Sequence, residues 1–152
     1  MNNQLEGKIT DIDFIKKMIP QKDPFVMIDK LLYFDAEKVV SGFKVTSDNI
    51  LTSPDGYFTE GGLIENMAQS IALHRGYRGY INRGKDEKPK TGFIGSIKHA
   101  TINSLPKAGT ELTTTVEIVA EIMMVSLVNI TVQDEEGNIV ATSEMKTIIV
   151  DS

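Results

Sequence analysis

The stretch GLIENMAQSIALHRGYRGY, residues 62–80, decides the fold. Apolar residues recur in it at the 3.6-residue spacing of an α-helix, at Leu63, Ile64, Met67, Ala68, Ile71 and Ala72. The apolar arc is wide and carries small residues, so we expect a helix that is buried rather than lying on a surface. Gly76 and Gly79 are expected to mark its fraying end.

The segments on either side of this helix are typical of β-strands. Before it, DIDFIKKMI predicts a short helix capped by Asp11 and stopped by Pro20, and FVMIDKLLYFD and EKVVSGFKVT predict a hairpin. The polar residues 47–60, with their Pro-Asp-Gly turn signal, predict a loop. After the helix, residues 92–102 and 112–122 predict two strands, and MVSLVNITV and NIVATSEMKTIIV predict two more, joined by the turn DEEGN.

Six strands and one long apolar helix must bury their apolar faces against each other. The layer arrangement that does so is a helix wrapped by a curved antiparallel sheet, which is the α+β hotdog fold. No internal repeat or second compositional region interrupts the chain, so we expect one hotdog domain over residues 1–152. An exposed sheet edge invites pairing with a second copy, which predicts a dimer or a higher hotdog oligomer.

Composition excludes several functional classes. With no cysteine among 152 residues, the chain has no disulfide, thiolate nucleophile or cysteine zinc site. The N-terminus lacks the pattern of a signal peptide, and no apolar run approaches the length of a membrane span, so we expect a soluble cytoplasmic protein. The sequence shows no Gly-rich phosphate loop, metal-ligand spacing or nucleophile elbow, so we expect no bound cofactor and no metal.

The charge pattern bears on partners. A net charge of -5 opposes attraction to a phosphate backbone, so nucleic acid is not an expected partner. A local basic enrichment can still meet an acidic protein partner, although it also fits a solvated helix end and loop. Its members are Arg75, Arg78, Arg83, Lys85, Lys88 and Lys90.

Three segments carry a resemblance to a known family. They are IPQKDPFVMIDKLLYF at residues 19–34, LIENMAQSIALH at residues 63–74 and GFIGSIKHATINSLPKAGTEL at residues 92–112. They resemble the 3-hydroxyacyl-[acyl-carrier-protein] dehydratases, which have the hotdog fold. Within that family the chain is most similar to the divergent dehydratases of aryl polyene and flexirubin-type pigment clusters. The resemblance places Glu65 at the position of the catalytic acid.

One motif departs from that family. Where the ordinary dehydratases carry Gly-His-Phe-Pro before the central helix, this chain has Gly56-Tyr57-Phe58-Thr59, so the expected histidine is absent. Tyr57 stands at its position and is expected to orient the substrate or donate a hydrogen bond, although its phenol is a poor base. By the same resemblance, Phe58 is expected at the substrate site.

The chemistry that the resemblance implies needs a base, an acid and donors for the thioester oxygen. Glu65 suits the acid or base, and its alternative is an exposed first-turn glutamate stabilised by the helix dipole. Gly61 and Gly62 would let a thioester carbonyl approach the amides of the helix N-terminus; alternatively, they serve an entry turn with unusual backbone angles. Gln69, one turn after Glu65, either orients the carboxylate or makes an ordinary buried amide pair.

The chain has only two histidines, His74 and His99, that could replace the missing loop histidine. His74 follows Glu65 by nine residues, on the opposite side of an ideal helix, so the pair would meet only across a subunit interface. Otherwise His74 is a hydrogen-bonded residue near the helix end. His99 is expected to be half-exposed scaffolding on a strand, and Asp29 to be structural.

The leading hypothesis is a dehydratase that converts a 3-hydroxyacyl thioester to a 2-enoyl thioester, with an acyl carrier protein as the partner that carries the chain. It predicts a tunnel for the acyl group. Two alternatives remain open: a hotdog thioesterase in which Glu65 activates water, and a non-catalytic acyl-binding subunit that pairs with a companion dehydratase.

Overall fold

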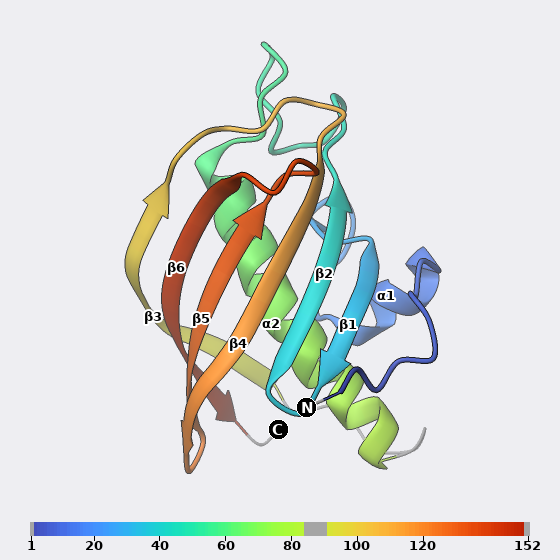
Figure 1. Ribbon diagram of the computed structural model, residues 1–152, viewed down its shortest axis with the longest axis vertical. Helices are drawn as coiled ribbons and strands as arrows, with labels where there is room; N and C mark the ends of the chain where they lie inside the picture. The colour runs from blue at the N-terminus through green and yellow to red at the C-terminus, as the bar shows by residue number, and fades with distance from the viewer. Residues whose placement is uncertain (1, 84–90, 151–152) are drawn as a thin grey trace.

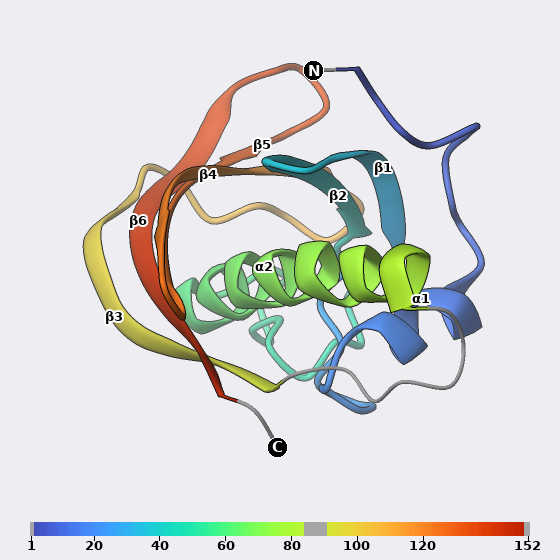
Figure 2. The same cartoon turned by 90° about the horizontal axis from the view of Figure 1, so that it is seen from below.

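The computed structural model describes residues 2–83 and 91–150. Along the chain the elements are α1 (Ile12–Met18), β1 (Lys30–Asp35), β2 (Lys38–Lys44), α2 (Glu60–Arg83), β3 (Thr91–Ile102), β4 (Glu111–Ile122), β5 (Val125–Gln133) and β6 (Ile139–Val150). The strands form one antiparallel sheet in the order β1-β2-β4-β5-β6-β3. This sheet curves around α2, as Figure 2 shows, so the predicted α+β hotdog fold is confirmed.

The apolar arc of α2 forms the centre of the core. Leu63 and Met67 are completely buried, and Ile71 nearly so, against the concave face of the sheet, to which Val128 and Met145 contribute. Each such side chain stabilises the fold by about 1.5–3 kcal/mol. The predicted helix is therefore confirmed, and Figure 1 shows it crossing behind the strands.

The two ends of α2 differ from the prediction. The helix begins at Glu60, where Thr59 caps it: its hydroxyl accepts the Gly62 N–H at 3.3 Å. At the other end the helix does not fray at Gly76 but continues to Arg83. A Cβ on Gly76 would lie 1.9 Å from the backbone oxygen of Met18, so this glycine is needed for the close contact between α1 and α2.

The hairpins form where the turn residues predicted them. Asp35 accepts the Glu37 N–H at 2.8 Å in the β1–β2 turn, and Asp134 accepts two backbone N–H groups in the β5–β6 turn. β1 begins at Lys30 rather than at Phe25. The prediction of a strand from Phe25 was wrong because the backbone of Phe25 and Met27 bonds to a side chain of α2, and contact with β2 starts only at Asp29, whose N–H donates to the Gly42 carbonyl at 2.9 Å.

The sheet ends at β1 on one side and β3 on the other. Along β3 the register shifts between Ile94 and Ser96 and again between Lys98 and Thr101, where exposed His99 has φ 52°. The outer edge of β3 pairs with no other strand in the described part of the chain. Neither described helix has the length and apolar character that a membrane span requires.

Candidate active site

Glu65 lies in the second turn of α2, because the helix begins earlier than predicted. Its side chain is half-buried. Stabilisation by the helix dipole fades beyond the first turn. The alternative of an exposed first-turn glutamate is therefore wrong. The helix dipole does not explain why a glutamate occupies this position.

Gln69 holds the Glu65 carboxylate in place. Its Nε2 donates to Glu65 Oε1 at 3.0 Å and to the Phe25 carbonyl at 2.7 Å, and its Oε1 accepts the Met27 N–H at 2.6 Å. The Gln69 side chain is completely buried. Among residues 2–83 and 91–150, no hydrogen-bond partner faces Glu65 Oε2. Gln69 thus fixes one oxygen of the Glu65 carboxylate.

A second polar layer, which was not predicted from the sequence, supports the same helix turn. Asn66 donates to the Met27 carbonyl at 2.8 Å and accepts the Thr114 hydroxyl at 2.6 Å. One turn on, the hydroxyls of Ser70 and Ser41 are 2.7 Å apart. All four side chains are completely buried. The only signal in the sequence is the presence of Asn66 and Ser70 beside the apolar arc, and it names neither partner strand.

Gly61 and Gly62 differ in how much space surrounds them. A Cβ on Gly62 would lie 2.6 Å from the Phe58 ring, so steric packing explains this glycine. Neither glycine has a positive φ, and the alternative of an entry turn with unusual backbone angles is wrong. Gly61 is exposed, and a Cβ there would meet only Thr59 Oγ1, at 3.9 Å. A ligand can therefore approach the backbone at Gly61.

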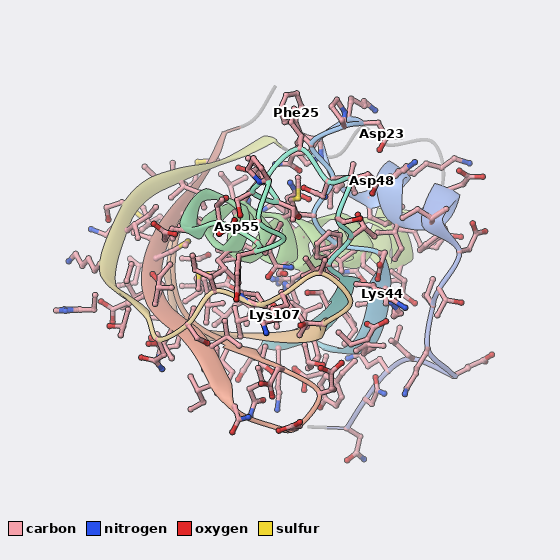
Figure 3. All side chains as sticks on the ribbon, turned by 90° about the horizontal axis from the view of Figure 1, so that it is seen from above. Asp23, Phe25, Lys44, Asp48, Asp55 and Lys107 are labelled. Atoms are coloured by element: carbon pink, nitrogen blue, oxygen red, sulfur yellow. The ribbon has the colours of Figure 1, made fainter. Side chains whose placement is uncertain are left out.

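Tyr57 and Phe58 point in different directions from the loop before α2. Tyr57 is half-buried and pairs with Lys107, whose Nζ lies 5.9 Å from its ring centre. Figure 3 looks onto the end of the molecule that carries Lys107 and Asp55. Phe58 is completely buried and packs 5.5 Å from the Phe43 ring. The expected contacts of Tyr57 and Phe58 with substrate stay predictions.

His74 lies away from Glu65 within this chain. His74 is 4% exposed, stacks on Phe34 and donates from Nε2 to the Asp35 carbonyl at 2.9 Å. Burial is the main reason that its pKa is lowered. Nine residues along the helix separate it from Glu65 by about 13 Å. His99 lies on β3, as predicted, but is exposed rather than half-exposed.

Several other expectations concern the surroundings of the site. Asp29 accepts from Lys30 Nζ at 2.7 Å and from the Lys44 N–H at 3.0 Å, so it is structural as expected. Within residues 2–83 and 91–150, no three His, Asp or Glu side chains form a group that could hold a metal ion. Of the basic enrichment, Lys85, Lys88 and Lys90 lie outside the described residues.

Comparison with known proteins supports the resemblance from two directions. The model of the ApeP-like family, described as ApeP dehydratase, matches residues 14–151. The 3-hydroxyacyl-[acyl-carrier-protein] dehydratase FabZ of Clostridium botulinum (strain Loch Maree) is 28% identical over 143 residues, which cover 93% of this chain and 97% of that protein. The FabZ of Aliivibrio fischeri is 23% identical over 145 residues, covering 93% and 94%.

Solved structures share the fold at low identity. A chain of the dehydratase heterocomplex ApeI:P from Xenorhabdus doucetiae has a TM-score of 0.81 at 15% identity and covers 91% of both chains. A hypothetical thioesterase from Streptococcus pneumoniae, solved with coenzyme A, has a TM-score of 0.65 at 16% identity and covers 93% of this chain and 96% of that chain. Since the family model matches almost the whole length of the sequence, the chain belongs to the ApeP-like dehydratase family.

Proposed function

We propose that this protein eliminates water from a 3-hydroxyacyl thioester borne by an acyl carrier protein, giving a 2-enoyl thioester. The observation that carries the proposal is the clamp of Gln69 on one oxygen of Glu65, with the second oxygen left open. A carboxyl group held in one orientation at the edge of an apolar core suits proton transfer to or from a bound substrate.

In the proposed reaction, Glu65 is the general acid. A base removes a proton from the α-carbon, the electron pair forms the new double bond, and the hydroxyl on the β-carbon leaves as water with a proton from Glu65. Negative charge develops meanwhile on the thioester oxygen. The approachable backbone at Gly61, in the first turn of α2, lies where the positive end of the helix dipole stabilises such charge.

The base is the part of the reaction that the described chain does not supply near Glu65. Tyr57 occupies the loop position, and His74 is bonded to the Asp35 carbonyl elsewhere on the helix. We therefore propose that a second hotdog chain completes the site, either another copy or a companion dehydratase that bears a histidine. The unpaired edge of β3, which carries Ile94 (37% exposed) and Ile97 (45% exposed), offers a surface for that pairing.

The test is incubation with a 3-hydroxyacyl carrier protein, with and without a companion dehydratase, followed by mass spectrometry of the carrier. We expect loss of one water, abolished in Glu65→Gln and retained in Glu60→Gln, an exposed first-turn glutamate of the same helix. In Glu65→Gln the rate of water loss should fall by about 10²-fold or more, the usual contribution of a general acid.

Other outcomes of this experiment separate the alternatives. Release of the free acid from the carrier would support thioester hydrolysis instead. Water loss that needs the companion but survives Glu65→Gln would make this chain an acyl-binding subunit. Size-exclusion chromatography with light scattering, run on each variant, ensures that a lost assembly is not mistaken for lost chemistry.

A further inference from the structure

A cavity lies between the C-terminal half of α2 and the concave face of β4, β5 and β6. Its volume is about 330 Å³. Glu65, Gln69 and Tyr57 do not line it. Arg75, which does, follows Glu65 by ten residues, about 15 Å along the helix axis. Ile71, which also lines it, follows Glu65 by six residues, about 9 Å, so the arginine end of the cavity is the part remote from the candidate active site.

The walls of this cavity divide into an apolar and a polar part. The apolar part consists of aliphatic side chains from α2, β4, β5 and β6: Ile71, Val116, Ile118, Val128 and Ile149. The polar part includes Arg75, Arg78 and Glu121, with the hydroxyls of Ser126 and Thr147. A cavity of this size, mostly apolar with a few polar groups, is typical of small-molecule sites. The division favours a ligand that has one charged end.

Arg75 supplies the charge for that end. Its side chain is half-buried, and Nη2 donates to Thr147 Oγ1 at 3.1 Å. Its guanidinium packs against Gly92, where a Cβ would lie 1.5 Å from Nη1 and would displace it. No carboxylate of residues 2–83 and 91–150 forms an ion pair with it. Burial lowers its pKa, yet an arginine stays charged, so an anion would relieve the desolvation.

The charge balance indicates how many negative charges the ligand carries. Arg78 and Glu121 neutralise each other across 3.4 Å, which leaves the single charge of Arg75. His74 adds none, because burial lowers its pKa and its Nε2 already donates to Asp35. A second negative charge on the ligand would meet Glu121. One guanidinium and one carboxylate match in both geometry and charge, whereas a phosphate dianion does not.

We propose that this cavity binds an amphiphilic monocarboxylate, with its carboxylate on Arg75 and its aliphatic or aryl body against the apolar wall. Its volume of about 330 Å³ lies within the range of small-molecule sites and suits a ligand with a medium-length aliphatic chain. The site does not depend on the proposed elimination. A free acid bound there would stabilise α2, the helix that also carries Glu65.

The experiment is calorimetric titration of the full chain with decanoate and, separately, with decanol, which has the same chain without the charge. We expect saturable decanoate binding at one site and a rise in melting temperature with decanoate concentration. Arg75→Gln should weaken decanoate by about tenfold or more and leave decanol almost unchanged. Gly92→Ala, which displaces the guanidinium, should act in the same direction.

The control is Glu65→Gln, which should bind decanoate as the unaltered chain does. Loss of decanoate binding in Glu65→Gln would place the acid at the active site and overturn the proposal. Equal weakening of decanoate and decanol by Arg75→Gln would show that the arginine only shapes the cavity, and this would overturn it too. Absence of saturable decanoate binding at millimolar concentration would have the same consequence.

Discussion

Gln69 Nε2 donates to Glu65 Oε1 at 3.0 Å. The backbone of residues 25–27, which also bonds to the Gln69 side-chain amide, allows that amide only one orientation. The Met27 N–H can only donate, so the Gln69 oxygen must face it, at 2.6 Å. The Phe25 carbonyl can only accept, so the Gln69 nitrogen must face that group, at 2.7 Å. The crossing segment of residues 25–27 thereby determines which end of the amide meets the carboxylate.

Replacing this amide should weaken both the fold and the reaction. In Gln69→Leu the buried Met27 N–H and the part-buried Phe25 carbonyl lose their partner, and a fully buried unsatisfied group costs about 1–3 kcal/mol, a part-buried one less. We therefore expect the free energy of unfolding in urea to fall by about 2–4 kcal/mol. The turnover rate should fall while KM changes little, because Gln69 orients Glu65 and need not contact substrate.

Gln133→Leu is a matched control for that experiment. Gln133 Nε2 makes one exposed bond, to the Gly137 carbonyl at 3.2 Å, so its loss should cost less than about 1 kcal/mol and leave turnover unchanged. Equal effects of the two substitutions on stability would contradict the interpretation of Gln69 as a buried clamp. A drop in stability without any change in turnover would deny its positioning role.

The sequence predicts the fold well because its signals are local. The 3.6-residue period of α2, the cap at Asp11 and the acidic turn DEEGN each depend on neighbours along the chain. The polar layer under α2 does not: Asn66 and Thr114 are 48 positions apart, and no local pattern pairs them. The need for glycine at positions 62 and 76 is not visible in the local sequence either, since the atoms that require glycine there belong to Phe58 and Met18.

The candidate site is predictable in part. The spacing of Glu65 and Gln69 anticipated their contact, which depends only on one helix turn. The sequence does not predict the backbone partners of Gln69, because the residue types at 25–27 are typical of a strand. The position of the Arg75 guanidinium could not be predicted either, because its neighbours Gly92 and Thr147 come from two strands, β3 and β6.

His74 should make the protein sensitive to mild acid. Burial lowers its pKa in the folded state, whereas in the unfolded chain it titrates near 6.5. Below that pH the unfolded state takes up the proton and the folded state resists it, so protons favour unfolding. The stability that His74 contributes is complete above about pH 6.5 and is lost as the pH falls through the folded pKa.

Urea unfolding at pH 7.5 and 5.5 measures this effect. We expect His74→Gln, which keeps a donor for the Asp35 carbonyl, to lose less stability between the two pH values than the unaltered chain. His99→Asn removes an exposed histidine and suits the positive φ at that position, so it should keep the full pH dependence. The opposite ranking of the two variants would show that His74 is not the sensitive group.

Filling the space at Gly62 should distort the start of α2. A methyl group there would lie 2.6 Å from the Phe58 ring, which is completely buried and cannot turn aside into solvent. We expect Gly62→Ala to lower the free energy of unfolding by about 1–3 kcal/mol, the range for overpacking a core. An unchanged or raised midpoint of urea unfolding would mean that Phe58 and its loop move aside without loss of stability.

Gly76 and Gly61 together separate helix propensity from packing within one helix. Alanine is favoured over glycine in a helix by about 1 kcal/mol, so both substitutions gain from propensity. At Gly76 that gain is outweighed, because the new methyl would lie 1.9 Å from the Met18 carbonyl oxygen, a backbone atom that moves only if α1 moves. Gly76→Ala should therefore destabilise the protein.

Gly61→Ala should do the reverse, since the nearest atom is Thr59 Oγ1 at 3.9 Å and the position is exposed. We expect its melting temperature to stay or rise while elimination slows, because the methyl group stands where the thioester oxygen would approach the first turn of α2. A stable Gly61→Ala that retains full turnover would remove the backbone at Gly61 from the mechanism, and it would leave the assignment of Glu65 intact.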